Sequence, residues 1–233
     1  MRLQCYQKFY FQNTLFLNFE NKHPLFPCKK PCETCLVLYN SRVDLVKQKK
    51  PKSYKMSVEI IIGNMFSGKT SELIRRLKRY RVLGKSISVI NSSKDTRSEK
   101  DVIHSHDGVD FDCLKLNKLS NALLDKNFCD ADVVAVDEAQ FFVNLKGFVQ
   151  MCLFLKKTVI LTGLDADYKQ EKFGQIIDCI PVADSVTKLS ALCMRCKDGT
   201  PGPFTKRLVD TNELELVGGC ETYEAVCRHH LIV

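Results

Sequence analysis

The chain has 233 residues, of which 45% are hydrophobic and 27% charged, as is typical of a globular protein with a buried core. No apolar run approaches the roughly eighteen residues that cross a bilayer, and no secretory signal is recognisable, so we expect neither a membrane protein nor a secreted one. The net charge is +8, and residues 1–55 account for all of it. The rest of the chain balances at zero, so the basic character does not indicate a nucleic-acid-binding body.

The first 55 residues show no hydrophobic periodicity and close with KQKKPKSYK, a basic linker that contains proline. We therefore expect a disordered extension that is separate from the folded body. Cys28, Cys32 and Cys35 lie in it with a histidine nearby, which raises the alternative of a second metal site. Scattered thiols in an extended arm are the favoured interpretation, because metal sites usually have better-spaced cysteine pairs.

The chain contains 12 cysteines, and several of them, such as Cys152 and Cys179, lie within apolar runs. Without a secretory signal, this distribution favours reduced thiols and metal ligands over a disulfide framework. We therefore expect the protein to work in a reducing compartment, the cytoplasm.

From Ser57 onward, apolar runs alternate with segments of helical period. The runs predicted as buried strands are VEIII (58–62), SISVIN (86–91), DVVAVD (132–137) and TVILTGLD (158–165). Residues 70–83 carry a helical apolar stripe with a basic outer face, and residues 139–157 have the length and composition of a helix. This alternation predicts an α/β domain with a parallel sheet over residues 56–192. Glycine and proline then become more frequent, and ELELVGG (213–219) is typical of a strand, so we expect a small module over residues 193–233.

The segment GNMFSGKT (63–70) matches the pattern G-x-x-x-x-G-K-[ST], and it follows a predicted strand and opens a predicted helix. Glycines at such a turn let backbone N–H groups wrap phosphate oxygens, and the helix N-terminus stabilises the anion. We expect Lys69 to reach the terminal phosphates and the Thr70 hydroxyl to ligate Mg²⁺. The segment therefore predicts a nucleoside triphosphate site.

Two adjacent acids follow the strand predicted at 132–137. Asp137 lies at its carboxyl end, where a carboxylate can hold Mg²⁺ through water. Glu138 points in a different direction, and a carboxylate there can simply complement a helix dipole. Beside a phosphate loop, however, a second acid more often accepts the proton of an attacking hydroxyl or water. We therefore expect Glu138 to be a general base.

The phosphate loop and the acid pair fit two classes of protein. One is a nucleoside-type kinase, and the other is a DEAx-box helicase or ATPase, because VDEAQ also resembles that box. Such helicases need two ATPase-type domains, for which the body is too short, and its balanced charge argues against a nucleic-acid track. We prefer the kinase, with no nucleic acid or membrane as a partner. A P-loop ATPase or nucleic-acid-binding module with a zinc ribbon is the alternative.

CMRC (193–196) and CRHH (227–230) have complementary metal-ligand spacing. Cys193 and Cys196 form a C-x₂-C pair, and Cys227 and His230 form a C-x₂-H pair further along the chain. Three sulfurs and one imidazole suit tetrahedral Zn²⁺. His229 is expected to point away, because adjacent residues on a helical turn cannot face the same way. The spacing predicts a structural zinc site.

With these motifs in this order, the chain resembles the cytosolic, type II thymidine kinases from about Val58 to His230. The segments that carry the resemblance are MFSGKT, DEAQFF, KFGQIIDCIPVADSVTKLSALCMRC, TKRL and GGCETYEAVC. The resemblance implies a P-loop, RecA-like α/β domain and a zinc-ribbon module whose lasso-like loop covers the nucleoside. It further implies that the protein phosphorylates thymidine with Mg²⁺ and ATP in nucleotide salvage, and that it is a homotetramer inhibited by the triphosphate end product. It implies nothing about residues 1–55.

Carried over by position, the resemblance assigns three groups of residues. Glu138 becomes the base that accepts the proton of the thymidine 5′-hydroxyl. The residues implied for ATP and Mg²⁺ are Gly63, Asn64, Met65, Phe66, Ser67, Gly68, Lys69, Thr70, Asp95, Thr96, Arg97, Asp137, Glu138, Ala139 and Gln140, of which Met65 would also wall the base. The residues implied for thymidine are Phe141, Leu164, Tyr168, Phe173, Thr205, Leu214, Glu215, Leu216, Val217, Gly218 and Tyr223. Without the resemblance, Phe141 and Phe173 are more typical of a core.

Three positions depart from the pattern of many relatives. Ala139 stands where many have glycine, and Tyr168 where many have phenylalanine. His230 stands where many have a fourth cysteine, although a Cys₃His set is chemically sound. The stretch KDGTPGPF after Cys196 is slightly longer than usual, which affects the placement of Thr205.

Overall fold

The computed structural model describes residues 56–95, 102–104, 110–210 and 216–232, and all of these belong to one compact unit, Tyr54–Val233. The predictions for residues 1–55, including a second metal site at Cys28, Cys32 and Cys35, lie outside the described residues. Among the helices of the described ranges, none is long and apolar enough to cross a membrane.

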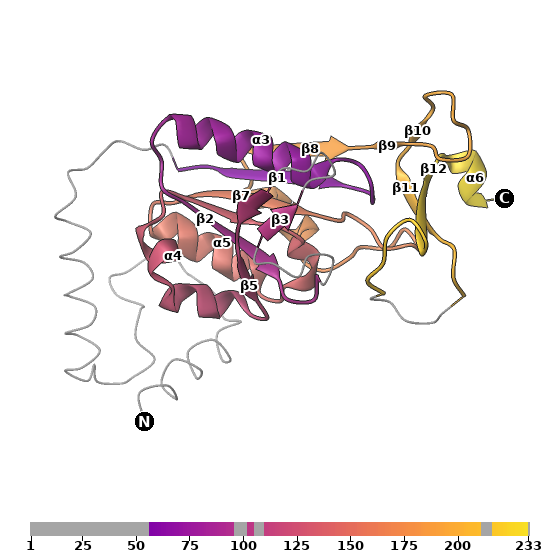
Figure 1. Cartoon of the computed structure of the whole chain (residues 1–233). Coiled ribbons are helices and arrows are strands. Elements are labelled where there is room, and N and C mark those ends of the chain that lie inside the picture. The colour runs from indigo at the N-terminus through magenta and orange to yellow at the C-terminus, as the bar shows by residue number, and fades with distance from the viewer. Residues whose placement is uncertain (1–55, 96–101, 105–109, 211–215, 233) are drawn as a thin grey trace, which may run out of the picture. The chain divides into compact units, whose positions relative to one another are not determined.

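A six-stranded parallel sheet forms the centre of the unit, with the strand order β5-β2-β6-β7-β1-β8 (Figure 1). Its strands are β1 (Val58–Gly63), β2 (Ile87–Ser92), β5 (Leu114–Leu116), β6 (Val133–Val136), β7 (Thr158–Gly163) and β8 (Ser185–Leu189). β3 (Val102–His104) and β4 (Asp110–Asp112) form a separate antiparallel pair. β1, β2, β6 and β7 correspond to the four predicted strands, and they are largely buried, as expected for parallel strands covered on both faces. The predicted parallel α/β fold is confirmed.

Helices cover both faces of this sheet (Figure 1). α3 (Lys69–Val82) packs on one face, where Leu73 and Leu77 join a core with strand residues such as Ile61. The elements on the other face are η1 (Leu119–Leu124), α4 (Lys126–Asp130), α5 (Leu145–Phe154) and η3 (Ile177–Val182). They form a second core with the alternate strand residues, such as Ile60. Because successive side chains of a strand point to opposite faces, one sheet supplies both cores.

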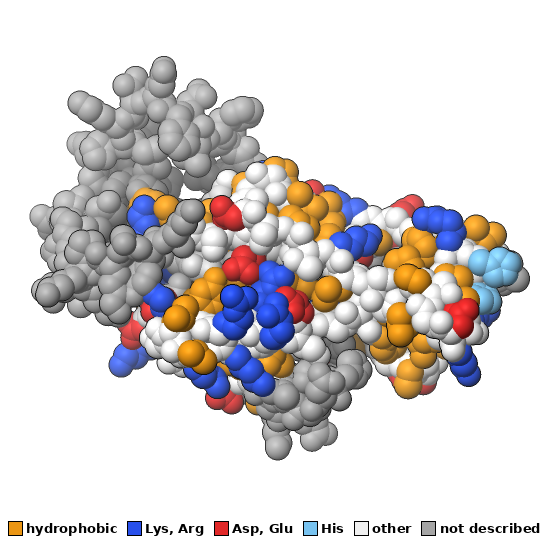
Figure 2. All heavy atoms as spheres, turned by 90° about the horizontal axis from the view of Figure 1, so that it is seen from above, with side chains coloured by type: hydrophobic (Ala, Val, Ile, Leu, Met, Phe, Trp, Pro, Cys, Tyr) orange, Lys and Arg blue, Asp and Glu red, His pale blue; other side chains and the backbone are white. Residues whose placement is uncertain are grey.

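α3 matches the first predicted helix, and Figure 2 shows basic side chains gathered on this face together with a few acidic ones. Arg76 ties the helix to the sheet: its guanidinium donates to Glu59 on β1 at 2.7 Å and to Thr187 on β8 at 2.9 Å. It also donates to Glu72 at 2.8 Å. Hydrogen bonds from Arg75 and then Arg76 lower the pKa of Glu72 to about 2, so this carboxylate stays ionised.

The helix predicted over residues 139–157 is shorter than expected. Ala139–Phe141 forms the 3₁₀ turn η2, and α5 begins only at Leu145. Asn144 has a φ of 58°, a left-handed conformation that interrupts any helical path before α5. As a result, DEAQFF forms a turn at the carboxyl end of β6, from which Phe141 faces a cavity while Phe142 is buried in the core.

Residues beyond β8 form a small module of short strands and one helix. β9 (Ala191–Leu192) pairs with β10 (Pro201–Gly202), β11 (Phe204–Arg207) pairs with β12 (Tyr223–Val226), and α6 (Arg228–Ile232) follows. Both pairs are antiparallel. The strand predicted at 213–219 is absent from its described part, residues 216–219. The module has its own small core, in which Cys193, Val226 and Cys227 are buried against Phe204 and Leu231.

Candidate active site

The phosphate loop leaves β1 at Gly63 and enters α3 at Lys69. A Cβ atom at Gly63 would lie 2.4 Å from the carbonyl oxygen of Leu189, so a side chain has no room where β1 and β8 end side by side. Gly68 has a φ of +79°, the left-handed conformation through which the loop turns into the helix. The N-terminus of α3 therefore faces the loop, where its first backbone N–H groups are available to an anion.

Lys69 is buried and folds back over this loop. Its Nζ donates to the carbonyl oxygen of Asn64 at 2.7 Å, and the Ser67 hydroxyl donates to the same oxygen at 2.8 Å. Lys69 also lines the cavity described below. An ammonium group held beside a helix N-terminus gives this corner of the site a strongly positive potential, which suits a polyphosphate.

Asp137 and Thr70 meet between β6 and the phosphate loop. The Thr70 hydroxyl donates to Asp137 Oδ2 at 3.2 Å. Asp137 Oδ1 accepts from the backbone N–H of Glu138 at 3.0 Å and from the Thr162 hydroxyl of β7 at 2.5 Å. The carboxylate is thus fixed in orientation by two neighbouring strands. A hydroxyl and a carboxylate oxygen so close together are the kind of ligand that Mg²⁺ takes in phosphate sites.

Glu138 follows Asp137 but is held in a different direction by its backbone. Its φ of 48° is left-handed, which turns its side chain away from the strand direction. Gln140 Nε2 donates to Glu138 Oε2 at 2.5 Å, while Gln140 Oε1 accepts from the backbone N–H of Leu164 at 3.0 Å. Both side chains are buried and line the cavity. Gln140 therefore connects the Glu138 carboxylate to the loop after β7 and fixes its plane.

These groups surround one cavity of about 240 Å³. The phosphate loop forms one part of its wall, and the turn at the carboxyl end of β6 forms another. Aromatic side chains form the far part: the rings of Phe141 and Phe173 meet edge to face with centroids 5.8 Å apart, and Tyr168 lies on the same loop as Phe173. The cavity thus has one end formed by the phosphate loop and Lys69 and another formed by aromatic side chains, with Glu138 among the residues that line it.

The C-terminal module contributes a further part of the cavity wall. Thr205 Oγ1 on β11 accepts from the backbone N–H of Met65 at 3.1 Å, so the module is bonded directly to the phosphate loop. The Tyr223 hydroxyl donates to the carbonyl oxygen of Leu216 at 2.7 Å and so helps to hold residues 216–219, which line the cavity.

Most residues proposed from the sequence line this cavity. They are Met65, Phe66, Ser67, Gly68, Lys69, Thr70, Asp95, Asp137, Glu138, Gln140, Phe141, Leu164, Tyr168, Phe173, Thr205, Leu216, Val217, Gly218 and Tyr223. Three others, Gly63, Asn64 and Ala139, are described but are not part of the lining. Thr96, Arg97, Leu214 and Glu215 lie outside the described residues.

Other residues line the cavity without having been proposed from the sequence: Ser71, Asn91, Val102, Ile103, Ala166, Asp167, Arg207 and Gly219. Asn91 could have been proposed from the sequence, because it is a polar residue at the carboxyl end of a predicted strand, as Asp137 is. Its amide donates to Asp95 Oδ2 at 3.0 Å, and both side chains are buried. Arg207 had no comparable signal, because its position depends on how β11 pairs with β12.

Asn64 has a different position from the one its motif suggested. Its side-chain amide donates to the carbonyl oxygen of Gly202 at 2.8 Å and, more weakly, to that of Phe204 at 3.4 Å. Its Oδ1 accepts from the backbone N–H of Ala191 at 3.2 Å. The side chain of this loop residue therefore joins the phosphate loop to the C-terminal module.

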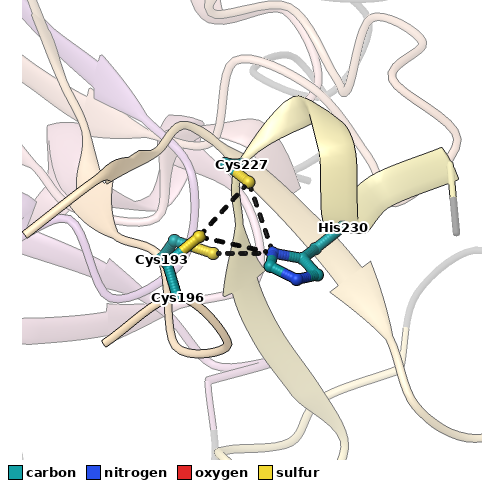
Figure 3. Close-up of side chains that lie close together, drawn as sticks. All are labelled: Cys193, Cys196, Cys227 and His230. Atoms are coloured by element: carbon teal, nitrogen blue, oxygen red, sulfur yellow. Dashed lines mark hydrogen bonds between the residues drawn. The ribbon is translucent and has the colours of Figure 1, made fainter. Parts of the chain in front are cut away.

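The four residues with metal-ligand spacing come together in the module. Figure 3 shows Cys193, Cys196, Cys227 and His230 pointing toward one another, and their ligand atoms all lie within 4.8 Å of one another. The distances from His230 Nδ1 to the three sulfurs are 3.4 to 3.6 Å, and Cys196 and Cys227 sulfurs are 3.8 Å apart.

This donor set fits a zinc ion. With bond lengths of about 2.3 Å to sulfur and 2.0–2.1 Å to nitrogen, a tetrahedral site has S···S edges of about 3.8 Å and S···N edges of about 3.5 Å. Burial opposes ionisation of Cys193, but backbone N–H groups beginning with that of Cys196 lower its pKa to about 6. Burial and the neighbouring sulfurs raise the pKa of Cys196 to about 11. His229 is exposed and is not among the clustered ligands.

Comparison with known proteins matches this arrangement to one family. The thymidine kinase family model matches residues 56–231. The chain belongs to the thymidine kinase family. It is 44% identical to thymidine kinase a of Arabidopsis thaliana over 183 residues, which cover 76% of this chain and 75% of that protein. It is 35% identical to the cytosolic thymidine kinase of Cricetulus griseus over 178 residues, covering 76% and 74% respectively.

Among solved structures, domain III of the Thermotoga maritima replication initiation protein DnaA has a TM-score of 0.31 and 15% identity, covering 66% of this chain and 61% of that one. So weak a likeness carries no argument. Membership of the thymidine kinase family therefore rests on the sequence relatives, and the parallel sheet with its phosphate loop is consistent with it.

Proposed function

We propose that this member of the thymidine kinase family transfers the γ-phosphate of Mg²⁺-bound ATP to the 5′-hydroxyl of thymidine, giving thymidine monophosphate. The observation that carries the proposal is the cavity itself. A phosphate loop, a hydroxyl–carboxylate pair and a buried second carboxylate line the same space as a cluster of aromatic side chains. Curated relatives with this family name support thymidine as the acceptor.

The phosphate half of the proposed site consists of Gly63 to Thr70. Backbone N–H groups of the loop and of the α3 N-terminus bind the phosphate oxygens, and Lys69 neutralises the terminal phosphates. Thr70 and Asp137 would hold Mg²⁺, which supplies charge neutralisation on the phosphates when bound. We assign Asp95, Thr96, Arg97, Ala139 and Gln140 to the nucleotide side as well, in line with the resemblance. Of these, Thr96 and Arg97 lie outside the described residues.

The chemical step in this proposal belongs to Glu138. Its carboxylate accepts the proton of the nucleoside 5′-hydroxyl as that oxygen bonds to the γ-phosphorus of ATP. The bond from this phosphorus to the β–γ bridging oxygen breaks, and ADP leaves. Gln140 fixes the plane of the carboxylate through its hydrogen bond to Oε2. The base is therefore already oriented before proton transfer. The buried setting keeps competing water away from the transferred group.

Thymidine would lie against the aromatic end of the cavity. Phe141, Leu164, Tyr168 and Phe173 present flat or aliphatic surfaces to the base. Tyr223 holds the segment at Leu216, and Thr205 joins β11 to Met65 of the phosphate loop. We assign residues 214–218 to this closing segment, with Leu214 and Glu215 outside the described residues. A planar base between apolar side chains, with few polar groups to orient it, is a common arrangement in small-molecule sites.

We further propose that Cys193, Cys196, Cys227 and His230 bind one structural Zn²⁺. A closed set of four protein ligands leaves no open position for chemistry, so the ion's contribution is to folding. It would join the start of the module to its end and thereby fix β11 and β12, which carry Thr205 and Tyr223. We divide the body, as proposed from the sequence, into a kinase domain, residues 56–192, and a zinc module, residues 193–233; β9, just before this boundary, pairs with β10 of the module.

The family resemblance also supports proposals about assembly and location. We propose a homotetramer in the cytoplasm that is inhibited by thymidine triphosphate. Light scattering on the purified chain tests the first point, and inhibition by the triphosphate at fixed ATP tests the last. A monomer with full activity would contradict the tetramer.

A panel of nucleosides with γ-labelled ATP tests the main proposal. Label should appear in thymidine monophosphate, and its formation should require Mg²⁺. Release of labelled inorganic phosphate without any labelled nucleotide would contradict the kinase and favour the P-loop ATPase alternative. Labelling of other nucleosides in preference to thymidine would retain the chemistry and change the acceptor.

A further inference from the structure

The side chains of strand β11 alternate between two faces, one toward the module core and one toward the active-site cavity. Phe204 packs into the small core with the cysteines, and Lys206 Nζ donates to the carbonyl oxygen of His230 at 2.8 Å. Thr205 and Arg207 have the opposite orientation and line the active-site cavity. The alternation is what a β-strand requires, because residues two apart share a face. Arg207 therefore belongs to the active-site face, although neither the motifs nor the family resemblance assigned it a role.

The Arg207 guanidinium contacts two aromatic residues of the cavity wall. Its central carbon lies 3.7 Å from the centroid of the Tyr168 ring, so the cation lies over the face of the ring. One of its terminal nitrogens donates to the Tyr223 hydroxyl at 2.9 Å. Arg207 and Tyr223 are direct partners in the antiparallel β11–β12 ladder, so the backbone register fixes this second contact.

These contacts continue to residues 216–219, which also line the cavity. The Tyr223 hydroxyl that accepts from Arg207 donates in turn to the Leu216 carbonyl. One arginine thus links the loop after β7, through Tyr168, to residues 216–219, through Tyr223. Only a planar fork with several donors can stack on a ring and donate at its edge together, which a lysine ammonium cannot do.

We propose that Arg207 is a positioning residue for the nucleoside, which sets the orientation of Tyr168 against the base and, through Tyr223, holds residues 216–219 in the cavity wall. This inference rests on the proposed thymidine kinase activity. Side chains that are already ordered lose less conformational freedom when the nucleoside binds. Ordering by Arg207 therefore raises the affinity for the nucleoside. Arg207 contacts Tyr168 and Tyr223, which belong to the nucleoside side of the cavity, so we expect its loss to affect thymidine binding more than ATP binding or the chemical step.

Steady-state kinetics on the full chain, with thymidine and ATP varied separately, test the proposal. Arg207→Met keeps the length of the side chain but removes both the stacked cation and the donor. We expect the KM for thymidine to rise about tenfold, and kcat and the KM for ATP to change by less than about threefold. Arg207→Lys keeps the charge without the planar, forked guanidinium, so its KM for thymidine should lie between those of Arg207→Met and the parent protein.

Arg228 provides a matched control, because its guanidinium stacks on Phe204 of the same module with its central carbon 4.6 Å from the ring centroid. It is not among the described residues that line the cavity. Arg228→Met should leave both KM values near those of the parent. Zinc content and thermal stability are measured for both variants, so that general loosening of the module is recognised.

A double-mutant cycle with Tyr223→Phe tests the link itself. Because Arg207 and Leu216 communicate through the Tyr223 hydroxyl, the effects of Arg207→Met and Tyr223→Phe on the KM for thymidine should be less than additive. Full additivity, an unchanged KM in Arg207→Met, or a parallel rise in both KM values with loss of zinc would each overturn the positioning role. If the parent protein fails to phosphorylate thymidine, the proposed function falls instead, which separates the two failures.

Discussion

At the scale of single residues, Glu138 combines burial with an uncommon backbone conformation. A non-glycine residue at a φ of 48° costs on the order of 1–3 kcal/mol, and such strain persists where the surroundings over-determine it. Here its own N–H is held by Asp137, and its carboxylate is held by Gln140. This conformation lets the two adjacent acids point in different directions: Asp137 points toward Thr70, and Glu138 points into the cavity.

The base assignment predicts a large loss in turnover for a nearly isosteric change. Glu138→Gln keeps shape and hydrogen-bonding capacity but cannot accept a proton, so kcat should fall by about two to four orders of magnitude while ATP still binds. Single-turnover rates together with ATP affinity from calorimetry measure this. Glu171→Gln, at an exposed acid that is not part of the cavity lining, is the control. Near-normal turnover in Glu138→Gln would exclude it as the base.

Asn64 shows why some roles could not be predicted from the sequence. The phosphate-loop pattern indicates what the loop's backbone does, but the partners of the Asn64 side chain lie more than 120 residues further along the chain. No local pattern encodes such contacts, and the same holds for Arg207. The lining residues that were proposed lie in motifs whose chemistry is local or carried by the family resemblance.

Removing this side chain should loosen the module. Asn64→Ala leaves a buried N–H and a buried carbonyl without their partner, which costs about 1–3 kcal/mol. We expect a lower melting temperature and a KM for thymidine that rises more than the KM for ATP. Asn121→Ala removes an exposed asparagine and should change neither quantity. A variant as stable as the parent would show that the module is held by its other contacts alone.

At the scale of elements, strands with buried β-branched runs were predicted at the right places because a parallel sheet buries both faces of each strand. The helix predicted at 139–157 was too long, since apolar composition does not reveal left-handed residues such as Glu138 and Asn144. The pairing of β11 with β12 was not predicted either. These strands are short and carry no clear alternating pattern, and only the cysteine spacing at 193 and 227 indicated that the two ends of the module meet.

The cysteine–histidine cluster predicts different outcomes for two adjacent histidines. His230→Ala should lose the zinc ion and weaken thymidine binding, because β11 and β12 would no longer be fixed at one end. His229→Ala should do neither, since its ring is exposed and outside the cluster. Metal analysis should give about one zinc per chain in the parent protein. Equal losses in the two variants would leave the fourth ligand unassigned, and a zinc-free parent with full thymidine affinity would contradict the site.

At the scale of the whole molecule, the net charge and the family match divide the chain at the same place. The excess positive charge lies in residues 1–55, and the family model begins its match at residue 56. All residues that line the cavity in the described ranges, and all four clustered metal ligands, lie beyond that point. The residues proposed for phosphate binding, proton transfer and zinc binding therefore all lie in the body of the chain.

A protein that begins at Met56 should consequently fold and phosphorylate thymidine with a kcat/KM within about threefold of the full chain. Loss of an essential group would lower kcat/KM by much more than that.

Metal analysis of both forms adds a second readout. If Cys28, Cys32 and Cys35 are only scattered thiols, each form binds about one zinc ion per chain, whereas a second site would give the full chain about two. An insoluble or inactive shortened protein would contradict the independence of the body. In combination with a metal ratio of two to one, that result would assign the extra ion a role in folding. Because a basic arm can engage anionic surfaces, any change confined to cellular location would leave the prediction intact.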